Sequence, residues 1–330
     1  MKRIGVLGAG TWGMALARVL SNVGHKVMVW SALEKEVEEF SATRVHPNLP
    51  GMQIPEAIEF TKSIEEVCTD KDFLLFAVPS VFVRSTARKA APYIPDGQIV
   101  LDVAKGIEPD TLLTMTQIMA EEFNNPTIKL VAFSGPTHAE EVARDLPTTI
   151  VAACEDVEAS EQVQDLFANT CMRVYTNTDV FGVELCGAMK NIMALAAGIA
   201  VGIGYGDNTK AALITRGIAE IARLGMAMGC QIETFLGLTG IGDLIVTATS
   251  VHSRNNRCGM LIGQGVPPQE AIRQVGMVVE GINALPAAMT LKEKYNVDMP
   301  LTESVHAVVN LGVPPLVQVQ SLMHRKIKAE

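Results

Sequence analysis

The sequence predicts a two-domain α/β protein, with a mostly parallel sheet flanked by helices and then an all-helical domain. Short apolar runs alternate with helical patterns over residues 1–178, and no strand pattern follows over residues 179–330. Alternating strands and helices are typical of a parallel sheet with helices on both faces. The length of 330 residues also favours two domains, because one hydrophobic core rarely serves so long a chain.

The chain begins with a strand, a glycine-rich turn and a helix. Residues 4–7 form an apolar run of strand length, Gly8, Gly10 and Gly13 match G-x-G-x-x-G, and residues 14–20 have a helical apolar period. The three glycines suit a tight turn, close approach of a pyrophosphate and close helix–strand packing. The helix N-terminus adds N–H groups and a positive dipole end. This stretch predicts a dinucleotide-binding domain that takes NAD or NADP.

A secretory signal peptide is the alternative for the same stretch. Met1–Arg3 is basic, apolar residues follow, and Ala15–Ala17 resembles a cleavage site. The three glycines interrupt the apolar segment, and cleavage after Ala17 would remove the first strand. We therefore favour the strand and turn.

The remaining elements of the first domain follow from local patterns. Strands are expected at Lys26–Trp30, Ile58–Thr61, Phe73–Val78, Ile99–Val103, Lys129–Phe133, Thr149–Ala153 and Met172–Tyr175. Helices are expected at Leu33–Ser41, Val81–Ala91, Thr111–Phe123 and Val157–Ala168. Ligands bind beyond the carboxyl ends of such strands, so the turns expected near the cofactor are Pro79-Ser80, Ala104-Lys105-Gly106 and Ser134–Thr137.

The second domain is predicted to contain helices alone. They are expected at Val180–Gly204, Thr209–Met228, Asn255–Gly263, Pro268–Val275, Ala284–Lys294 and Leu301–Leu311. Gly229, Gly265 and Gly312 are the expected stop signals, and two Pro-Pro pairs mark boundaries.

Composition narrows the classes of partner. The net charge of −9 and the pI near 5.3 argue against nucleic-acid and anionic-membrane partners, so an anionic small substrate needs a local basic cluster. Six cysteines are scattered without metal-ligand spacing, which predicts no metal site and a reducing compartment. The longest apolar run, Ile192–Gly204, is shorter than the about 20 residues of a bilayer span. We expect a cytoplasmic protein with no membrane insertion.

Lys190 is the first candidate for chemistry, because its helix face is otherwise small or apolar. Residues three and four apart on that face are Val183, Gly187, Ala194, Ala197 and Val201. Desolvation there would lower the pKa of Lys190 and suit it to proton exchange near neutral pH. The alternative is a lysine whose stem packs while its amine reaches water. Periodicity alone leaves both open.

Four further positions are candidates with ordinary alternatives. Lys105 follows a strand directly, although a loop lysine is common there. Asp243 lies in a glycine-lined turn, where it could pair with a lysine or cap the next helix. Ser253 is a suitable N-cap and Arg254 follows it, so this helix start could hold a phosphate or be a capped surface helix.

These stretches together resemble bacterial-type NAD(P)-dependent glycerol-3-phosphate dehydrogenase, from Ile4 to about Leu311. The matching motifs are GAGTWG (8–13), VPS (78–80), AKG (104–106), SGPTHAEEVA (134–143), FGVELCGAMKN (181–191), ALITRG (212–217), GLTGIGDL (237–244), SRN (253–255) and VVEG (278–281). The resemblance implies a Rossmann-like first domain and a second domain like the C-terminal one of 6-phosphogluconate dehydrogenase. It also implies a cytoplasmic homodimer that supplies the backbone of phospholipids.

The resemblance further implies site residues. Catalytic roles fall on Lys190 as proton acceptor, with Lys105, Asp243 and Asn191. Contacts to the cofactor, beside the three glycines, fall on Thr11, Trp12, Lys105, Ala139, Arg254, Val278 and Glu280. The substrate, glycerol 3-phosphate or dihydroxyacetone phosphate, is expected at Lys105, Gly135, Thr137, Lys190, Asp243, Ser253, Arg254 and Asn255.

The sequence departs from the family pattern at three places. Residues 30–33 lack the family's usual basic or histidine residue, and the first acid after the second strand is Glu34, within the expected helix. The choice between NAD and NADP therefore stays open, with NADPH expected to be accepted at least as well as NADH. His138 and Lys210 stand where Phe and Arg are more usual.

The sequence thus predicts hydride transfer between C2 of glycerol 3-phosphate and a nicotinamide cofactor. A related two-domain hydroxyacid dehydrogenase is the rival enzyme, and it would not need Arg254 at a helix start. A non-catalytic NAD(P)-binding regulator is the rival from another class, and it would not need Lys105, Lys190 and Asp243 together.

Overall fold

The computed structural model describes residues 1–327 and divides into two compact units. The first unit contains residues 1–105 and 113–184, and the second contains residues 106–112 and the chain from Leu185 onward. Helix α8 (Val180–Ile203) begins in the first unit and continues into the second. The two units are described separately below.

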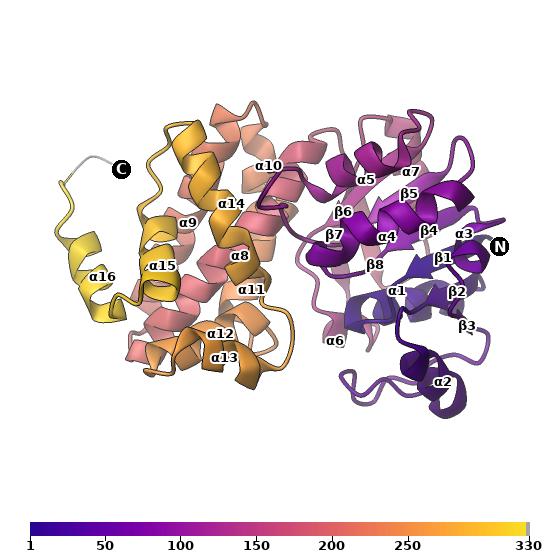
Figure 1. The fold of residues 1–330 in the computed structure, drawn as a ribbon, viewed down its shortest axis with the longest axis horizontal. Helices are drawn as coiled ribbons and strands as arrows, with labels where there is room; N and C mark the ends of the chain where they lie inside the picture. Colours follow the sequence, from indigo (N-terminus) through magenta and orange to yellow (C-terminus); the bar gives the residue numbers. More distant parts are fainter. Residues whose placement is uncertain (328–330) are drawn as a thin grey trace. The chain divides into compact units, whose positions relative to one another are not determined.

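An eight-stranded sheet forms the centre of the first unit (Figure 1). Its strands are β1 (Arg3–Leu7), β2 (Lys26–Trp30), β3 (Glu59–Thr61), β4 (Phe73–Phe76), β5 (Ile99–Asp102), β6 (Lys129–Ser134), β7 (Thr148–Ala153) and β8 (Met172–Asn177). They are ordered 3-2-1-4-5-6-7-8, and all neighbours are parallel except β6 and β7. The mostly parallel sheet is confirmed, with a single antiparallel pair among the described strands.

The register of the sheet determines where a ligand can bind. Leu7 is aligned with Trp30 on β2 and with Phe76 on β4, so three neighbouring strands end at one level. The strand order reverses between β1 and β4, and such a reversal is where open α/β sheets bind ligands. The glycine turn leaves β1 at this level.

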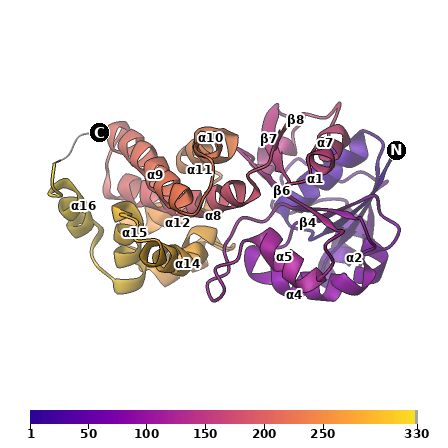
Figure 2. The same ribbon diagram turned by 90° about the horizontal axis from the view of Figure 1, so that it is seen from above.

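Helices cover both faces of this sheet. They are α1 (Thr11–Asn22), α2 (Glu34–Thr43), α3 (Ile64–Cys68), α4 (Val83–Ala90), α5 (Met115–Phe123), α6 (Ala139–Val142) and α7 (Val157–Leu166). Figure 2 shows α1 and α7 on one face and α4 and α5 on the other. One buried cluster includes residues of α1, α6 and α7, and a second includes residues of α3, α4 and α5.

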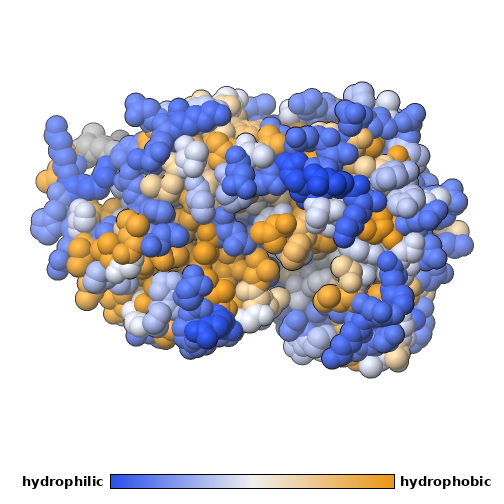
Figure 3. Space-filling model, in the orientation of Figure 1, coloured by the Kyte–Doolittle hydropathy of each residue, from blue (hydrophilic) through white to orange (hydrophobic). Residues whose placement is uncertain are grey.

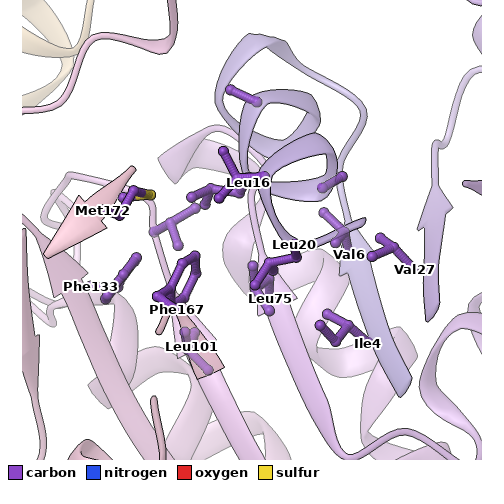
Figure 4. Packing of buried hydrophobic residues seen from close by; sticks show 14 of the residues in the cluster. Ile4, Val6, Leu16, Leu20, Val27, Leu75, Leu101, Phe133, Phe167 and Met172 are labelled. Atoms are coloured by element: carbon purple, nitrogen blue, oxygen red, sulfur yellow. The ribbon is translucent and has the colours of Figure 1, made fainter. Parts of the chain in front are cut away.

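The cluster beneath α1 and α7 explains the apolar runs in the sequence. Leu16 and Leu20 of α1 and Leu75 of β4 are fully buried in it (Figure 4). Phe133 of β6 stacks on Phe167, with ring centroids 4.9 Å apart. Burying such a side chain contributes about 1.5–3 kcal/mol to folding, so this face holds α1 and the turn before it against the sheet.

Two predicted helices differ from the structure for local reasons. The helix expected from Thr111 begins at Met115, because Leu112 has a left-handed φ of 62° and Thr114 forms a capping box with Gln117. The helix expected over Val81–Ala91 is three pieces: a 3₁₀ turn at Ser80–Phe82, α4, and a 3₁₀ turn at Ala91–Tyr93. The short helices α3 and α6 were not predicted.

From residue 185 to residue 327 the second unit contains helices and no strand, as predicted, whereas its residues 106–112 form a non-helical segment. Beyond α8 it contains α9 (Asp207–Ala227), α10 (Ile232–Leu236), α11 (Asp243–Thr249), α12 (Arg254–Gly263), α13 (Pro268–Val275), α14 (Glu280–Lys294), α15 (Pro300–Leu311) and α16 (Pro315–Met323). A π-helical turn, Leu238–Gly242, joins α10 to α11. The three predicted stop glycines, Gly229, Gly265 and Gly312, all have a positive φ. The sequence analysis missed α10, the π turn and α16.

Glycines explain how α8 and α12 pack. An added Cβ at Gly198 would lie 2.1 Å from the Asn256 carbonyl oxygen, and one at Gly259 would lie 2.2 Å from the Leu195 carbonyl oxygen. The same holds one turn further along at Gly202 and Gly263. The two helix backbones therefore touch, and no larger residue fits at these four positions.

Helix α8 and the segment Ile232–Thr249 are long and apolar enough to cross a membrane by length and composition alone. The most apolar part of α8 is 83% buried inside the protein, as expected for a core helix, whereas that of Ile232–Thr249 is 44% buried. On the face drawn in Figure 3, apolar side chains gather over part of the helical unit. Exposed apolar residues of α15 and α16 include Leu311, Leu316 and Met323.

Candidate functional site

The glycine turn has the geometry that its sequence predicted. Gly8 has a φ of +124°, and a Cβ there would lie 2.7 Å from the Ala77 carbonyl group. A Cβ at Gly13 would lie 2.3 Å from the Gly8 oxygen, so two of the glycines are required by packing. Gly10 differs, because a Cβ there would meet no protein atom within 4 Å. The open space beside Gly10, at the N-terminus of α1, fits the pyrophosphate of a dinucleotide.

Thr11 and Trp12 form the first turn of α1 and are partly exposed. The N-cap of α1 is Gly10, which offers no side chain to the helix N–H groups, and the first turn carries no acidic residue. An anion there meets backbone donors and a positive dipole end without a competing carboxylate. These residues fit a cofactor diphosphate.

The loops after β5 and β6 bring three predicted residues together in the first unit. The Lys105 ammonium donates a hydrogen bond to the Gly135 carbonyl oxygen at 3.1 Å. The Thr137 hydroxyl donates to the same oxygen at 3.1 Å. Ala139 begins the short helix α6 directly after this loop and packs into the core. A cation, a hydroxyl and a helix start therefore lie at one place.

Asp102, which the sequence analysis missed, shapes the loop that carries Lys105. It ends β5 with 1% exposure, and its carboxylate accepts a hydrogen bond from the Ala104 N–H at 3.1 Å. Burial, and then the nearby charge of Glu184, raise the pKa of Asp102 well above its usual value. Glu184 in turn accepts hydrogen bonds from the backbone N–H and the hydroxyl of Thr116.

Lys190 is buried in the middle of α8, at 5% exposure. Its ammonium donates to an Asp243 carboxylate oxygen at 2.9 Å and to the Thr247 hydroxyl at 2.6 Å. Of the two alternatives that periodicity left open, the structure has the buried lysine. Asp243 is 1% exposed, so each charge offsets the cost of burying the other. Asp243 is the first residue of α11, whose N-cap is Gly242 with no side-chain cap hydrogen bond, so the ion pair is found and the cap is not.

Thr247 was not predicted, although a signal for it exists. It lies four residues after Asp243 on α11 and therefore on the same helix face. Its hydroxyl oxygen accepts from Lys190 and lies 2.7 Å from the Asp243 carbonyl oxygen and 3.1 Å from its carboxylate. It thereby fixes the geometry of the ion pair.

Asn191 and Asn255 join three helices of the second unit. The Asn255 amide donates to the Asn191 side-chain oxygen at 3.0 Å, and its own oxygen accepts from the Gly281 N–H at 2.8 Å. Asn191 also donates to the Gly187 carbonyl oxygen at 3.1 Å. The Asn255 side chain thus connects α8 and α12 to the start of α14, and its backbone N–H is a further candidate for a ligand.

The start of α12 is the basic helix N-terminus that the sequence predicted. Ser253 is the N-cap, and its hydroxyl accepts from the Asn256 N–H at 3.2 Å. Arg254 is the first helical residue and partly exposed, and its guanidinium forms no hydrogen bond or ion pair with residues 1–327. A partly exposed arginine at a helix N-terminus is suited to bind a phosphate.

Val278 and Glu280 lie at the start of α14 and are partly exposed. Glu280 is the first helical residue, and it accepts a hydrogen bond from the Asn283 amide at 3.2 Å. The neighbouring Gly281 is the residue bound by Asn255. These two positions therefore lie beside the asparagine network in the second unit.

The end of β2 shows why the cofactor preference was hard to predict. Glu34, the first acid in sequence, forms an ion pair with Lys62. Glu36, two residues later, instead accepts a hydrogen bond from the buried Ser31 hydroxyl at 2.6 Å. The carboxylate that follows the second strand is therefore Glu36, brought there by the start of α2.

The two departures from the family pattern lie at helix starts. His138 is the N-cap of α6. Lys210 lies in the first turn of α9 and pairs with Asp207 at 3.1 Å. Neither is part of the Lys190 cluster defined by Lys190, Asp243 and Thr247.

Comparison with known proteins gives matches over nearly the whole chain. The family model described as NAD-dependent glycerol-3-phosphate dehydrogenase N-terminus matches residues 3–160, and the corresponding C-terminus model matches residues 179–320. A glycerol-3-phosphate dehydrogenase [NAD(P)+] of Lactobacillus delbrueckii subsp. bulgaricus is 63% identical, with 100% of this chain and 99% of the relative covered. One from Agathobacter rectalis is 53% identical, with 100% and 98% covered.

A solved structure agrees with these relatives. The crystal structure of glycerol-3-phosphate dehydrogenase from Coxiella burnetii is 35% identical, has a TM-score of 0.94, and covers 98% of this chain and 99% of that one. Both domains, the order of the motifs and the glycine turn agree with these matches. This chain belongs to the NAD(P)-dependent glycerol-3-phosphate dehydrogenase family.

Proposed function

We propose that this protein interconverts sn-glycerol 3-phosphate and dihydroxyacetone phosphate and so supplies the backbone of glycerophospholipids. The observation that carries the proposal is the buried Lys190–Asp243 ion pair, in a chain that belongs to this family. A buried lysine held by a carboxylate is suited to exchange a proton with a substrate oxygen. The full-length relatives carry the same activity in their names.

The bound nicotinamide cofactor supplies the hydride acceptor for C2 in the oxidation and the hydride donor in the reduction. Gly8, Gly10 and Gly13 shape the turn, and backbone N–H groups at the N-terminus of α1 hold its diphosphate. The Gly8 N–H is not one of these donors, because it donates to the Trp30 carbonyl oxygen at 2.9 Å. The further residues proposed to contact it are Thr11, Trp12, Lys105, Ala139, Arg254, Val278 and Glu280.

Lys190 transfers the proton in this proposal. In the reduction its Nζ gives a proton to the oxygen on C2, and in the oxidation it takes the hydroxyl proton back. Asp243 and Thr247 each bind Nζ and so fix its direction. Lys105 adds positive charge that stabilises the developing oxyanion, and Asn191 is the neighbour of Lys190 on α8.

The substrate phosphate is bound at the start of α12. Arg254 and the backbone N–H group of Asn255 are its proposed donors. The Ser253 N–H, expected to join them, instead donates to the Ser250 carbonyl oxygen at 3.2 Å. Gly135 and Thr137, beside Lys105, are proposed to contact the substrate as well. The domains proposed for these roles are residues 1–178 for the cofactor and 179–330 for the substrate.

Lys190→Ala tests the proposal. Loss of a positioned acid–base group typically costs 10²–10⁴-fold, so kcat with dihydroxyacetone phosphate should fall by about that factor while NADH still binds. The matched control is Lys292→Ala, which removes a lysine that pairs with Glu303 elsewhere in the same unit. Near-normal kcat in a folded Lys190→Ala protein would contradict the assignment.

We also propose that the protein is a cytoplasmic homodimer, as the family resemblance implies. The exposed apolar residues of α15 and α16 are compatible with a subunit contact. Light scattering of the purified protein gives the mass of the particle. A monomer at micromolar concentration would contradict the dimer.

A further inference from the structure

His46 lies in the segment that connects α2 to β3, far in sequence from the glycine turn, yet it contacts that turn. It is 3% exposed, and its Nε2 lies 3.2 Å from the Ala9 carbonyl oxygen. Its Nδ1 accepts a hydrogen bond from the Asn48 N–H at 3.1 Å. A carbonyl oxygen only accepts and a backbone N–H only donates, so the neutral ring with its proton on Nε2 satisfies both partners.

The ring of His46 is held in place by its surroundings. It packs on Phe40 of α2, with ring centroids 5.0 Å apart, and Phe40 also contacts Phe60 of β3. Arg44, with a left-handed φ of 54°, donates to the Ile58 carbonyl oxygen at 2.7 Å and closes the segment. The direction of the Nε2–H bond is therefore fixed by packing and not by the turn itself.

Burial keeps the ring neutral. Desolvation lowers the pKa of His46 from its ordinary value, while the Ala9 carbonyl and then the carboxylates of Glu36 and Glu39 on α2 oppose that shift. The neutral ring retains Nδ1 as an acceptor for Asn48. Both contacts thus persist at neutral pH.

The contact with Ala9 determines where Gly10 points its N–H. The Ala9 carbonyl and the Gly10 N–H belong to one planar trans peptide group, so they point in opposite directions. Ala9 is 3% exposed, whereas Gly10 is exposed. When His46 holds the oxygen on the buried side, the Gly10 N–H is directed to the other side. An added Cβ at Gly10 would meet no protein atom within 4 Å.

We infer that His46 is a positioning residue for cofactor binding, which aims the Gly10 N–H at the diphosphate of the dinucleotide. The inference rests on the proposed role of the glycine turn as the diphosphate site. Without the histidine, the Ala9–Gly10 peptide can rotate, and the ligand must then order it on binding. His46 does not touch the ligand; it acts through Ala9.

The test measures NADH affinity by fluorescence titration. His46→Leu removes both ring nitrogens, and the loss of one net hydrogen bond of about 1 kcal/mol raises Kd about fivefold to tenfold. His46→Gln retains an N–H donor at the position of Nε2 and can restore the hydrogen bond to Ala9. This variant should therefore bind NADH with a Kd within about twofold of that of the unchanged protein. If the leucine variant fails to fold, His46→Phe keeps the ring contact with Phe40 and is expected to give the same loss.

His25 provides a matched control in the same unit. Its Nδ1 accepts from the Lys2 N–H at 3.1 Å and its Nε2 lies 3.2 Å from the Leu166 carbonyl oxygen, the same pair of contacts as those of His46. Leu166 ends α7 and is not part of the turn. His25→Leu should therefore leave Kd for NADH unchanged. Equal weakening in both leucine variants would mean general destabilisation and overturn the inference.

Gly10→Ala distinguishes the role of His46 from the proposed role of the glycine turn as the diphosphate site. Gly10 has an ordinary φ of −68°, so alanine fits the backbone, and its methyl group intrudes only on a ligand. If Gly10→Ala weakens NADH and His46→Leu does not, the inference is wrong and the turn remains the diphosphate site. If Gly10→Ala has no effect, the proposed role of the turn is wrong, and the inference fails with it.

Discussion

The buried ion pair of Lys190 and Asp243 allows a sharp prediction about stability. Asp243→Asn removes the negative charge while keeping the shape and one acceptor oxygen. The ammonium of Lys190, 5% exposed on α8, then lies buried without the negative charge that Asp243 supplied. We expect the second unit to become less stable and the enzyme to lose turnover, because Nζ is no longer directed by a carboxylate.

The magnitude follows from the geometry. At 2.9 Å and an effective dielectric constant of about 20, the attraction between the two charges is about 6 kcal/mol. Desolvation of both groups offsets part of it, and removing one partner of a buried pair typically costs about 3–5 kcal/mol. We expect the free energy of unfolding to fall by that amount. Thr247→Val removes one hydrogen bond to a charged group and should cost less, about 1.5–3 kcal/mol.

Urea unfolding followed by two signals can locate the effect. Both tryptophans, Trp12 and Trp30, lie in the first unit, so their fluorescence reports on that unit alone. The loss in Asp243→Asn should appear in far-UV circular dichroism, where the helices of the second unit contribute, and not in the tryptophan transition. Two probes are needed because proteins with two domains often depart from two-state unfolding.

The double variant Lys190→Met, Asp243→Asn decides whether charge is the cause. It removes the ammonium that the single variant leaves uncompensated, so it should be more stable than Asp243→Asn. A double variant that is less stable by the sum of the single effects would refute the electrostatic reasoning.

Three further predictions concern the substrate, the cofactor and pH. Arg254→Ala should raise KM for dihydroxyacetone phosphate about tenfold to a hundredfold, because charge-assisted hydrogen bonds of about 1.5–3 kcal/mol are lost. The KM for plain dihydroxyacetone should change far less. Equal weakening of both substrates would mean that the phosphate binds elsewhere. Steady-state kcat/KM should be at least as high with NADPH as with NADH; a strong preference for NADH that Glu36→Gln relieves would instead identify Glu36 as the selecting group. Burial raises the pKa of Glu220 to about 7, although hydrogen bonds from Leu301 and Thr302 lower it in part. Between about pH 4.5 and 7 the folded state therefore binds a proton that the unfolded state does not. Stability should fall as pH rises through that window, by up to about 3 kcal/mol; melting curves of Glu220→Gln should lose this slope, and an unchanged slope would assign it to another group.

The sequence by itself determined the features that depend on short stretches of chain. Glycine spacing after an apolar strand predicted the turn at Gly8–Gly13, because each glycine answers a local steric requirement. Helical periodicity predicted α8 and placed Lys190 on a face of small residues. Ser253 was predicted as an N-cap from its position alone, and its hydroxyl caps Asn256 in the structure.

The resemblance to a family determined the activity, because the motifs occur in order over most of the chain and the comparisons confirm that membership. Local reasoning gave Lys105, Asp243 and Arg254 only as candidates. Each is a residue type that is common at loops or helix starts, so its alternatives could not be dismissed from its neighbours in sequence.

Tertiary structure alone decided which distant groups meet. His46 lies 37 residues from Ala9, and Asp243 lies 53 residues from Lys190. In sequence Glu36 is one of several acids at the start of a helix, and only the fold shows that it binds Ser31. The fold likewise shows that the Asn255 side chain joins helices. Periodicity shows which side of its own helix or strand a residue occupies. The partner on the facing element is determined by how helices and strands pack, and that depends on the whole core.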